Sequence, residues 1–233
     1  MRAHLVPGFS QPAAVWDATR AALPVSVRAE FTGHEVPDGL DFVATAATIG
    51  AAGGIGLYVG YSMGGRLALQ LALDHPQLVR ALVLVSASAG VADPVARAAR
   101  AEEDERRAED IRTRGVRAFL ADWLAQPLFS TLAPADRMVD ARVGAMDPER
   151  LARQMTRLGQ GAMAPLWDRL AELRMPVTIV VGRADTRYRE LGHVMADRIA
   201  RAELVEVAGG HAVPLEQPAE LAAVLAAVHA ATS

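Results

Sequence analysis

Residues 58–69 of the chain read YVGYSMGGRLAL, and this stretch decides the fold because it describes a strand that turns abruptly into a helix. The apolar run at 56–59 has the composition of a buried strand, and the residues after Ser62 follow helical spacing. Glycines on both sides of Ser62 permit the sharp reversal and leave the hydroxyl at the end of the strand. The pattern predicts a catalytic serine, and an ordinary glycine-rich turn is the alternative.

The same alternation extends along much of the chain. Short β-branched or leucine-rich runs predict strands at 4–6, 25–30, 56–59, 81–86, 177–181 and 204–207. Helical patterns lie between most of them, at 15–23, 39–50, 64–74 and 218–230. This order predicts the α/β class, with a mostly parallel sheet covered by helices on both faces.

The alternation stops after Ser88 and resumes only at MPVTIVVG, residues 175–182. Between them the sequence predicts helical segments at 93–114, 115–125, 134–143, 148–158 and 164–173, with Pro and Gly at several junctions. We interpret residues 91–173 as a helical cap inserted into a core formed by residues 1–90 and 174–233.

Composition excludes several classes of protein. With 52% hydrophobic residues, 22% charged residues and a formal net charge of −3, the chain lacks the basic excess of nucleic-acid-binding proteins. Cysteine is absent, which excludes disulfides, thiolate catalysis and thiolate metal sites. No apolar run approaches the roughly 20 residues of a membrane-spanning helix, so we expect a cytoplasmic protein without membrane insertion.

A catalytic serine needs a base that is held by a third group. Asp185 follows a predicted strand in GRAD, and His211 follows the last predicted strand in GGHAVPLEQP. The main-chain N–H groups of Met63 and Phe9 are the expected oxyanion-hole donors, since Met63 begins a helix and Phe9 follows the first strand. His34 also lies in a loop after a strand, where a structural role is the favoured interpretation over a place in the pocket.

These motifs, with the elbow at residues 60–64, resemble the α/β-hydrolase superfamily. A closer resemblance runs through nearly the whole chain, to the 2-succinyl-6-hydroxy-2,4-cyclohexadiene-1-carboxylate (SHCHC) synthases of menaquinone biosynthesis. It rests on VGYSMGGRLALQLAL (59–73), SASAGV (86–91), FLADWLAQPLF (119–129), APLWDRLAEL (164–173) and GRADTRY (182–188). The cap segments make it specific, because the elbow is shared by many chemistries.

The resemblance implies a lyase that eliminates pyruvate from 2-succinyl-5-enolpyruvyl-6-hydroxy-3-cyclohexene-1-carboxylate, without a metal or an organic cofactor. Ser62, activated by His211 and Asp185, would then be a base and would not become acylated. The implied substrate is a small polycarboxylate, and the positions matching the family's substrate-binding residues are Tyr61, Arg66, Arg100, Trp123 and Arg142. Guanidinium groups suit that task because they bind carboxylates bidentately and stay charged when partly desolvated.

Two other classes of function stay open. A serine hydrolase would use the same three residues to form an acyl-enzyme on an ester, a thioester or a carbon–carbon bond of a small carboxylate-bearing substrate. A ligand-binding protein on a hydrolase scaffold is the other alternative. For Arg100 and Arg142, an exposed position on a helix is the alternative to a binding role, because every basic residue of the chain is arginine.

The sequence departs from the family in two places. The family usually opens its oxyanion loop with His-Gly, whereas this chain has Pro7-Gly8, so a side chain that could brace the loop is lost. The first predicted strand also lies almost at the start of the chain, which predicts a sheet shortened by two strands. An edge exposed in this way could pair with a second copy, so monomer and homodimer are both compatible with the sequence.

Overall fold

The computed structural model describes residues 1–33 and 40–232, and its centre is a six-stranded sheet in which all paired strands are parallel. The strands are β1 (Arg2–Val6), β2 (Arg28–Phe31), β3 (Gly56–Tyr61), β4 (Val79–Val85), β5 (Val177–Gly182) and β6 (Ala202–Val207). Their order, β2-β1-β3-β4-β5-β6, places β3 inside the sheet between β1 and β4. The predicted fold class is confirmed, and β2 and β6 are the edges.

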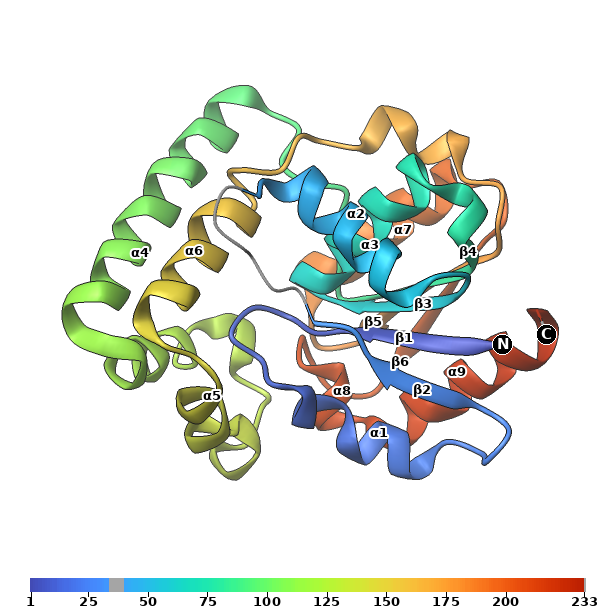
Figure 1. Cartoon of the computed structure of the whole chain (residues 1–233), viewed down its shortest axis with the longest axis horizontal. Coiled ribbons are helices and arrows are strands. Elements are labelled where there is room, and N and C mark those ends of the chain that lie inside the picture. Colours follow the sequence, from blue (N-terminus) through green and yellow to red (C-terminus); the bar gives the residue numbers. More distant parts are fainter. Residues whose placement is uncertain (34–39, 233) are drawn as a thin grey trace.

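Helices cover both faces of the sheet (Figure 1). On one face lie α2 (Phe42–Gly53), α3 (Met63–Asp74) and α7 (Thr186–Arg198), and on the other α1 (Asp17–Ala22) and α9 (Pro218–Thr232). Alternate strand residues belong to two separate apolar clusters: Tyr58 and Leu67 are members of one, and Val59 and Leu221 are members of the other. Burial on both faces explains why the strands read as continuous apolar runs.

A helical insertion separates β4 from β5 and lies beside the sheet (Figure 1). It contains α4 (Pro94–Trp123), α5 (Val139–Ala145) and α6 (Pro148–Leu158), and α4 and α6 pack side by side. Ile111 of α4 and Leu151 of α6 belong to a third apolar cluster, which Ala212 of the core also joins. The exact division of the chain into core and cap domains at residues 91 and 173 stays a prediction.

Several element boundaries differ from the sequence prediction for identifiable reasons. The strand predicted at 25–30 begins only at Arg28, because the Val27 N–H closes a turn onto the Pro24 carbonyl (2.9 Å). The helix predicted at 39–50 begins at Phe42, where the Asp41 side chain caps the Ala44 N–H (2.8 Å), and runs on to Gly53.

The cap also differs in detail from the sequence prediction. The segments predicted at 93–114 and 115–125 merge into α4, whose helical geometry is interrupted at Gly115 (φ 81°, ψ 164°), the predicted junction. The helix predicted at 164–173 is wrong, because only a 3₁₀ segment, Trp167–Glu172, forms there. The Leu166 N–H donates instead to the Ala89 carbonyl (2.8 Å), which ties this segment to the chain after β4. In the described part of the chain, no helix is long and apolar enough to cross a membrane.

Candidate active site

Ser62 stands at the turn between β3 and α3 in a strained backbone conformation, with φ 51° and ψ −110°. A left-handed φ is costly for any residue except glycine, so the surrounding chain has to enforce it. The turn also lies very close to neighbouring backbone: a Cβ on Gly64 would stand 2.3 Å from the Val6 carbonyl oxygen. Close packing of this kind requires glycine beside Ser62 and leaves the serine side chain partly accessible.

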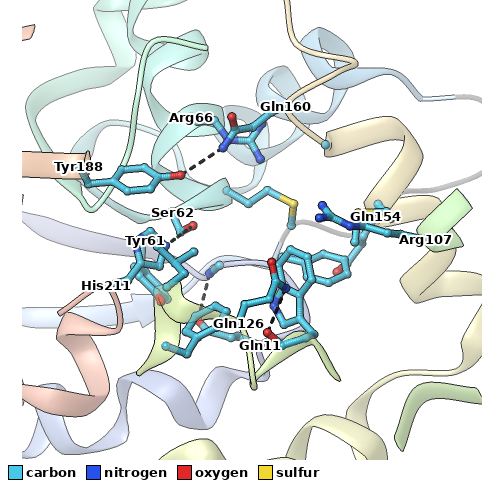
Figure 2. Close-up of a pocket in the computed structure, with 18 of the residues that line it drawn as sticks. Gln11, Tyr61, Ser62, Arg66, Arg107, Gln126, Gln154, Gln160, Tyr188 and His211 are labelled. Carbon is cyan, nitrogen blue, oxygen red and sulfur yellow. Dashed lines mark hydrogen bonds between the residues drawn. The ribbon is translucent and has the colours of Figure 1, made fainter. Parts of the chain in front are cut away.

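Asp185 and His211 complete a hydrogen-bonded line with Ser62, of which Figure 2 shows the Ser62 and His211 side chains. Asp185 follows β5 and caps α7, where its Oδ1 accepts from the Tyr188 N–H (3.3 Å). Its Oδ2 lies 2.7 Å from His211 Nδ1, and His211 Nε2 lies 3.1 Å from Ser62 Oγ. A carboxylate on Nδ1 favours the imidazole tautomer whose Nε2 is free to accept the serine proton.

Aromatic rings enclose the imidazole of His211, which is only 2% exposed. The ring centroid of Tyr188 lies 4.5 Å from that of His211, and Tyr61 and Phe129 follow at 5.7 and 5.9 Å. Exclusion of water strengthens the electrostatic interactions among the three polar groups. The arrangement can therefore move a proton from the serine hydroxyl to the imidazole, which either serine-based chemistry requires.

The expected oxyanion donors belong to residues of the cavity that contains Ser62. Phe9, in the loop after β1, and Met63, the first residue of α3, line the same cavity as Ser62. The loop is organised at Gly8, whose N–H donates to Oε1 of Gln11 at 3.2 Å, and Figure 2 shows the Gln11 side chain. Gln11 therefore contacts the loop that Pro7-Gly8 opens, and sequence reasoning did not identify it.

A cavity of about 360 Å³ opens above Ser62 between the core and the cap. All the site residues predicted from the sequence line it except Asp185, which lies behind His211. Tyr61, Ser62 and Arg66 come from the core, whereas Arg100, Trp123 and Arg142 come from the cap. The cavity is positively charged, because the described residues lining it include five arginines and one glutamate, Glu103.

Two of these arginines are buried without an acidic partner among the described residues. Arg66 is 6% exposed and lies over the Phe42 ring (5.7 Å), and burial lowers its pKa to about 10. Arg142 is 2% exposed, and its guanidinium donates to Ser10 Oγ (2.8 Å) and to the Arg137 carbonyl (2.9 Å). Burial lowers the pKa of Arg142 as well. Both remain cations at neutral pH, and an anion in the cavity would offset their desolvation.

Arg100 differs because it already has a partner. Its Nε donates to Asp104 Oδ1 (2.7 Å), one turn along α4. The Asp104 side chain is 2% exposed, so its carboxylate neutralises part of the charge that Arg100 brings to the cavity. Arg100 lines the cavity, but with less unpaired charge than Arg66 or Arg142, and its substrate-binding role stays a prediction.

The sequence of this chain matches that of a known protein family. Residues 5–224 match the alpha/beta hydrolase family. The chain belongs to this family. Among its relatives, a putative SHCHC synthase of Bacillus subtilis (strain 168) is 34% identical over 166 residues, which cover 69% of this chain and 60% of the relative. The SHCHC synthase of Enterobacter sp. (strain 638) is 32% identical over 173 residues, which cover 73% of this chain and 65% of the relative.

The matches thus span less than two thirds of either relative's length. Among solved structures, MenH from S. aureus superposes with a TM-score of 0.93 at 20% identity, covering 100% of this chain and 94% of that chain. A thermophilic esterase from Thermogutta terrifontis gives a TM-score of 0.82 at 22% identity, covering 100% and 91%. At these sequence identities the structural similarity supports the fold and nothing further.

Sequence reasoning missed several polar residues of this α/β-hydrolase site. Arg107 lines the cavity (Figure 2), bonds to Glu103 and lies over the Trp123 ring at 5.3 Å. It could have been found, because it lies seven residues after Arg100 on the same helix. Gln160 Nε2 donates to the Tyr188 hydroxyl (3.1 Å) at another wall of the cavity.

Glu216 of α8 (Val213–Glu216) was also missed, although it fixes the loop that carries His211. Its two carboxylate oxygens accept from the N–H groups of Gly210 and Ala212, both at 2.9 Å. Such a carboxylate restrains the histidine without touching it. Glu216 lies five residues after His211 in GGHAVPLEQP, but this spacing in a single sequence does not show that the carboxylate binds the loop.

The other histidines that the structure describes lie away from the cavity. The His4 ring lies tilted against that of Tyr58 in the sheet, with the centroids 4.8 Å apart, His193 pairs with Glu206, and His229 bonds to the Met1 carbonyl. His34 falls outside the described residues. No group of three His, Asp or Glu side chains that could hold a metal ion occurs within residues 1–33 and 40–232.

Proposed function

We propose that this α/β-hydrolase eliminates pyruvate from 2-succinyl-5-enolpyruvyl-6-hydroxy-3-cyclohexene-1-carboxylate to give SHCHC, a step of menaquinone biosynthesis. The observation that carries the proposal is the hydrogen-bonded line from Ser62 through His211 to Asp185, which opens into a cavity with two buried arginines that lack acidic partners among the described residues. The names of the relatives from Bacillus and Enterobacter support the same reaction.

In the proposed mechanism Ser62 is the base. His211 takes the Ser62 proton while Asp185 stabilises the imidazolium, and the serine oxygen removes a proton from a substrate carbon. Negative charge then develops on a substrate oxygen, where the N–H groups of Phe9 and Met63 would hold it. The charge then returns from that oxygen to the ring and forms one new double bond, the existing ring double bond shifts by one carbon, and the carbon–oxygen bond to the enolpyruvyl group breaks. The leaving enolate takes the proton held by the His211 imidazolium and becomes pyruvate.

The arginines have the binding role in this proposal. Arg66 and Arg142 would each bind a substrate carboxylate, and their burial without an acidic partner in the described part of the chain would make that contact strong. Arg100 would bind a carboxylate while remaining paired with Asp104. Tyr61 and Trp123 would supply the apolar walls. The reaction needs no metal and no organic cofactor.

The test is pyruvate release, followed by a coupled lactate dehydrogenase assay, with wild-type protein and with Ser62→Ala, Asp185→Asn and His211→Ala. We expect wild-type protein to release pyruvate faster than the reaction without enzyme, and each variant to lose that acceleration. Ser130→Ala is the matched control, because Ser130 is an exposed serine outside the cavity. Full activity of Ser62→Ala would overturn the mechanism.

A serine hydrolase with an acyl-enzyme intermediate is the second candidate, and the geometry of the elbow favours it. Ser62 Oγ, at 3.1 Å from His211 Nε2, is placed as a nucleophile would be. A small ester substrate with mass-spectrometric detection of acylated Ser62 separates the candidates. Acylation with ester turnover and no pyruvate release would establish the hydrolase.

A further inference from the structure

The loop after β1 is held from the cap as well as from within. Inside the loop, Gly8 and Gln11 exchange two hydrogen bonds, from the Gly8 N–H to Gln11 Oε1 (3.2 Å) and from the Gln11 N–H to the Gly8 carbonyl (3.3 Å). From the cap, Arg142 Nη1 donates to Ser10 Oγ (2.8 Å). This last bond joins residues 132 positions apart, so it connects α5 to the residue that follows Phe9.

Ser10 has a backbone conformation that needs such support. Its φ is 62°, in the left-handed region, and it is fully buried at 0% exposure. A residue with a side chain occupies this region at a cost in free energy, and it does so persistently where its surroundings hold it there. The bond from Arg142 is one such restraint, and it acts one residue away from the expected oxyanion donor.

Arg142 can hold Ser10 and an anion at the same time. A guanidinium has five N–H donors. The structure gives Arg142 two side-chain bonds, Nε to the Arg137 carbonyl and Nη1 to Ser10 Oγ. The remaining donors lie on a side chain that lines the cavity above Ser62. A carboxylate bound there would fix the guanidinium plane, and through it the Ser10 hydroxyl.

We propose that Ser10 is a positioning residue that couples carboxylate binding at Arg142 to the placement of the Phe9 N–H. Ser10 does not touch the reacting atoms. It replaces the brace that the family's histidine would provide at position 7, and it makes the oxyanion site most ordered when a carboxylate-bearing substrate is bound. The inference rests on the proposed function for the identity of that substrate, but the positioning role itself applies to either serine chemistry.

The test compares Ser10→Ala with Ser86→Ala. Ser86 is the matched control because it is also buried at 0% exposure with a positive φ of 47°, while its hydroxyl has no hydrogen-bond partner among the described residues. We expect Ser10→Ala to lower kcat for pyruvate release by about 10- to 100-fold, with a smaller rise in KM. The oxyanion donor stabilises the transition state more than the bound substrate, so its displacement affects kcat more than KM. Ser86→Ala should keep the wild-type kcat.

A second readout does not depend on the substrate. A small uncharged fluorophosphonate modifies an activated serine when Oγ bonds to phosphorus and fluoride leaves. Negative charge grows on the phosphoryl oxygen in the pentacoordinate transition state, so the rate of reaction with Ser62 also reports the oxyanion site. We expect slower modification of Ser10→Ala than of Ser86→Ala. If wild-type protein is modified but releases no pyruvate, the proposed function fails while this comparison still decides the role of Ser10. If wild-type protein does neither, both proposals are overturned.

Two further variants complete the experiment. Ser10→Gly also removes the hydroxyl, but glycine adopts the left-handed backbone conformation without strain. We expect this variant to lose as much kcat as Ser10→Ala, which would separate the lost hydrogen bond from backbone strain. In the double variant Ser10→Ala/Arg142→Gln, the losses of kcat should be smaller than the product of the single losses, because both substitutions break one bond. A rise in KM alone, equal losses in Ser10→Ala and Ser86→Ala, or multiplicative losses in the double variant would overturn the inference.

Discussion

Gly64 stands two residues after Ser62 and has no room for a side chain. A Cβ there would lie 2.3 Å from the Val6 carbonyl oxygen and 2.5 Å from that of Pro7, and backbone cannot move aside as a flexible side chain can. We predict that Gly64→Ala lowers the free energy of unfolding by about 1–3 kcal/mol or more. Urea unfolding followed by circular dichroism measures this change.

Gly144 in α5 provides the control for Gly64. An added Cβ at Gly144 meets nothing within 4 Å, so Gly144→Ala should be neutral or stabilise by up to about 1 kcal/mol through its helix propensity. Equal unfolding free energies for the two variants would contradict the view that close backbone contact sets the elbow.

His4 is a buried histidine with a predicted effect on stability in acid. It is 1% exposed, and burial lowers its pKa, with Glu30 opposing and Arg2 adding to the shift. Between its lowered folded-state pKa and the unfolded-state value of about 6.5, the unfolded chain binds a proton that the folded chain does not. The free energy of unfolding therefore falls as pH drops below about 6.5, by at most about 1.4 kcal/mol per pH unit from this group.

His4→Gln tests that prediction because it removes the titrating group and keeps a polar side chain. We expect the wild-type protein to lose more unfolding free energy between about pH 7 and pH 5 than His4→Gln does, as measured by urea unfolding at each pH. Parallel curves for the two proteins would mean that His4 does not titrate differently in the folded and unfolded chains.

At the scale of elements, the sequence predicts those boundaries and turns that are set by residues close together in the chain. The bounds of α6 agree with the predicted segment at 148–158, because Pro148 begins it and the Asp147 side chain caps the Arg150 N–H (2.9 Å). The β3–α3 turn was predictable for the same reason, since its glycines stand beside Ser62 in sequence. Contacts between distant residues, such as Arg142 with Ser10, leave no local pattern and were not predicted.

Asp104 holds α4 to the rest of the cap, and this gives a prediction for that element. Its carboxylate is 2% exposed, pairs with Arg100 (2.7 Å) and Arg107 (3.7 Å), and accepts from the Gly161 N–H (3.3 Å). Asp104→Ala leaves both arginines without this partner. We predict a loss of about 2–3 kcal/mol in unfolding free energy, below the range for fully buried pairs because the arginines are 23% and 24% exposed.

Asp110→Ala is the matched control on the same helix. Asp110 also pairs with an arginine four residues away, Arg114, but the two side chains are 36% and 46% exposed. An exposed pair of this kind contributes little, so we expect a change within about 0.5 kcal/mol. Hydrogen exchange should locate the Asp104→Ala effect in α4 and residues 159–161. A loss spread evenly over the sheet would count against Asp104 as a local tie.

At the scale of the whole molecule, the proposed chemistry and the proposed recognition come from different parts of the chain. The core supplies Ser62, Asp185 and His211 from positions after three strands, where the carboxyl ends of parallel strands meet. The cap supplies Arg100, Arg107 and Arg142 from above. Changes in cap arginines are therefore expected to alter substrate choice while leaving the hydrogen bonds around His211 in place.

Charge is distributed unevenly over this molecule, and that asymmetry predicts a salt effect. The chain has a formal net charge of −3, which repels a polyanion at long range, whereas the cavity has five arginines against one glutamate. A low-dielectric cavity focuses its own field, so the arginines should dominate once a substrate reaches the entrance. Raising NaCl from about 50 to about 500 mM shortens the Debye length to a few ångströms and should lower kcat/KM for the tricarboxylate substrate several-fold.

An uncharged activated ester provides the comparison, because the cavity field exerts no net force on it. Its kcat/KM should change less than about twofold over the same range of salt, and Arg142→Gln should weaken the salt dependence for the tricarboxylate. Thermal unfolding at each salt concentration checks that the protein stays folded. If both substrates respond to salt equally, the effect belongs to the protein as a whole, and the cavity arginines do not attract the substrate.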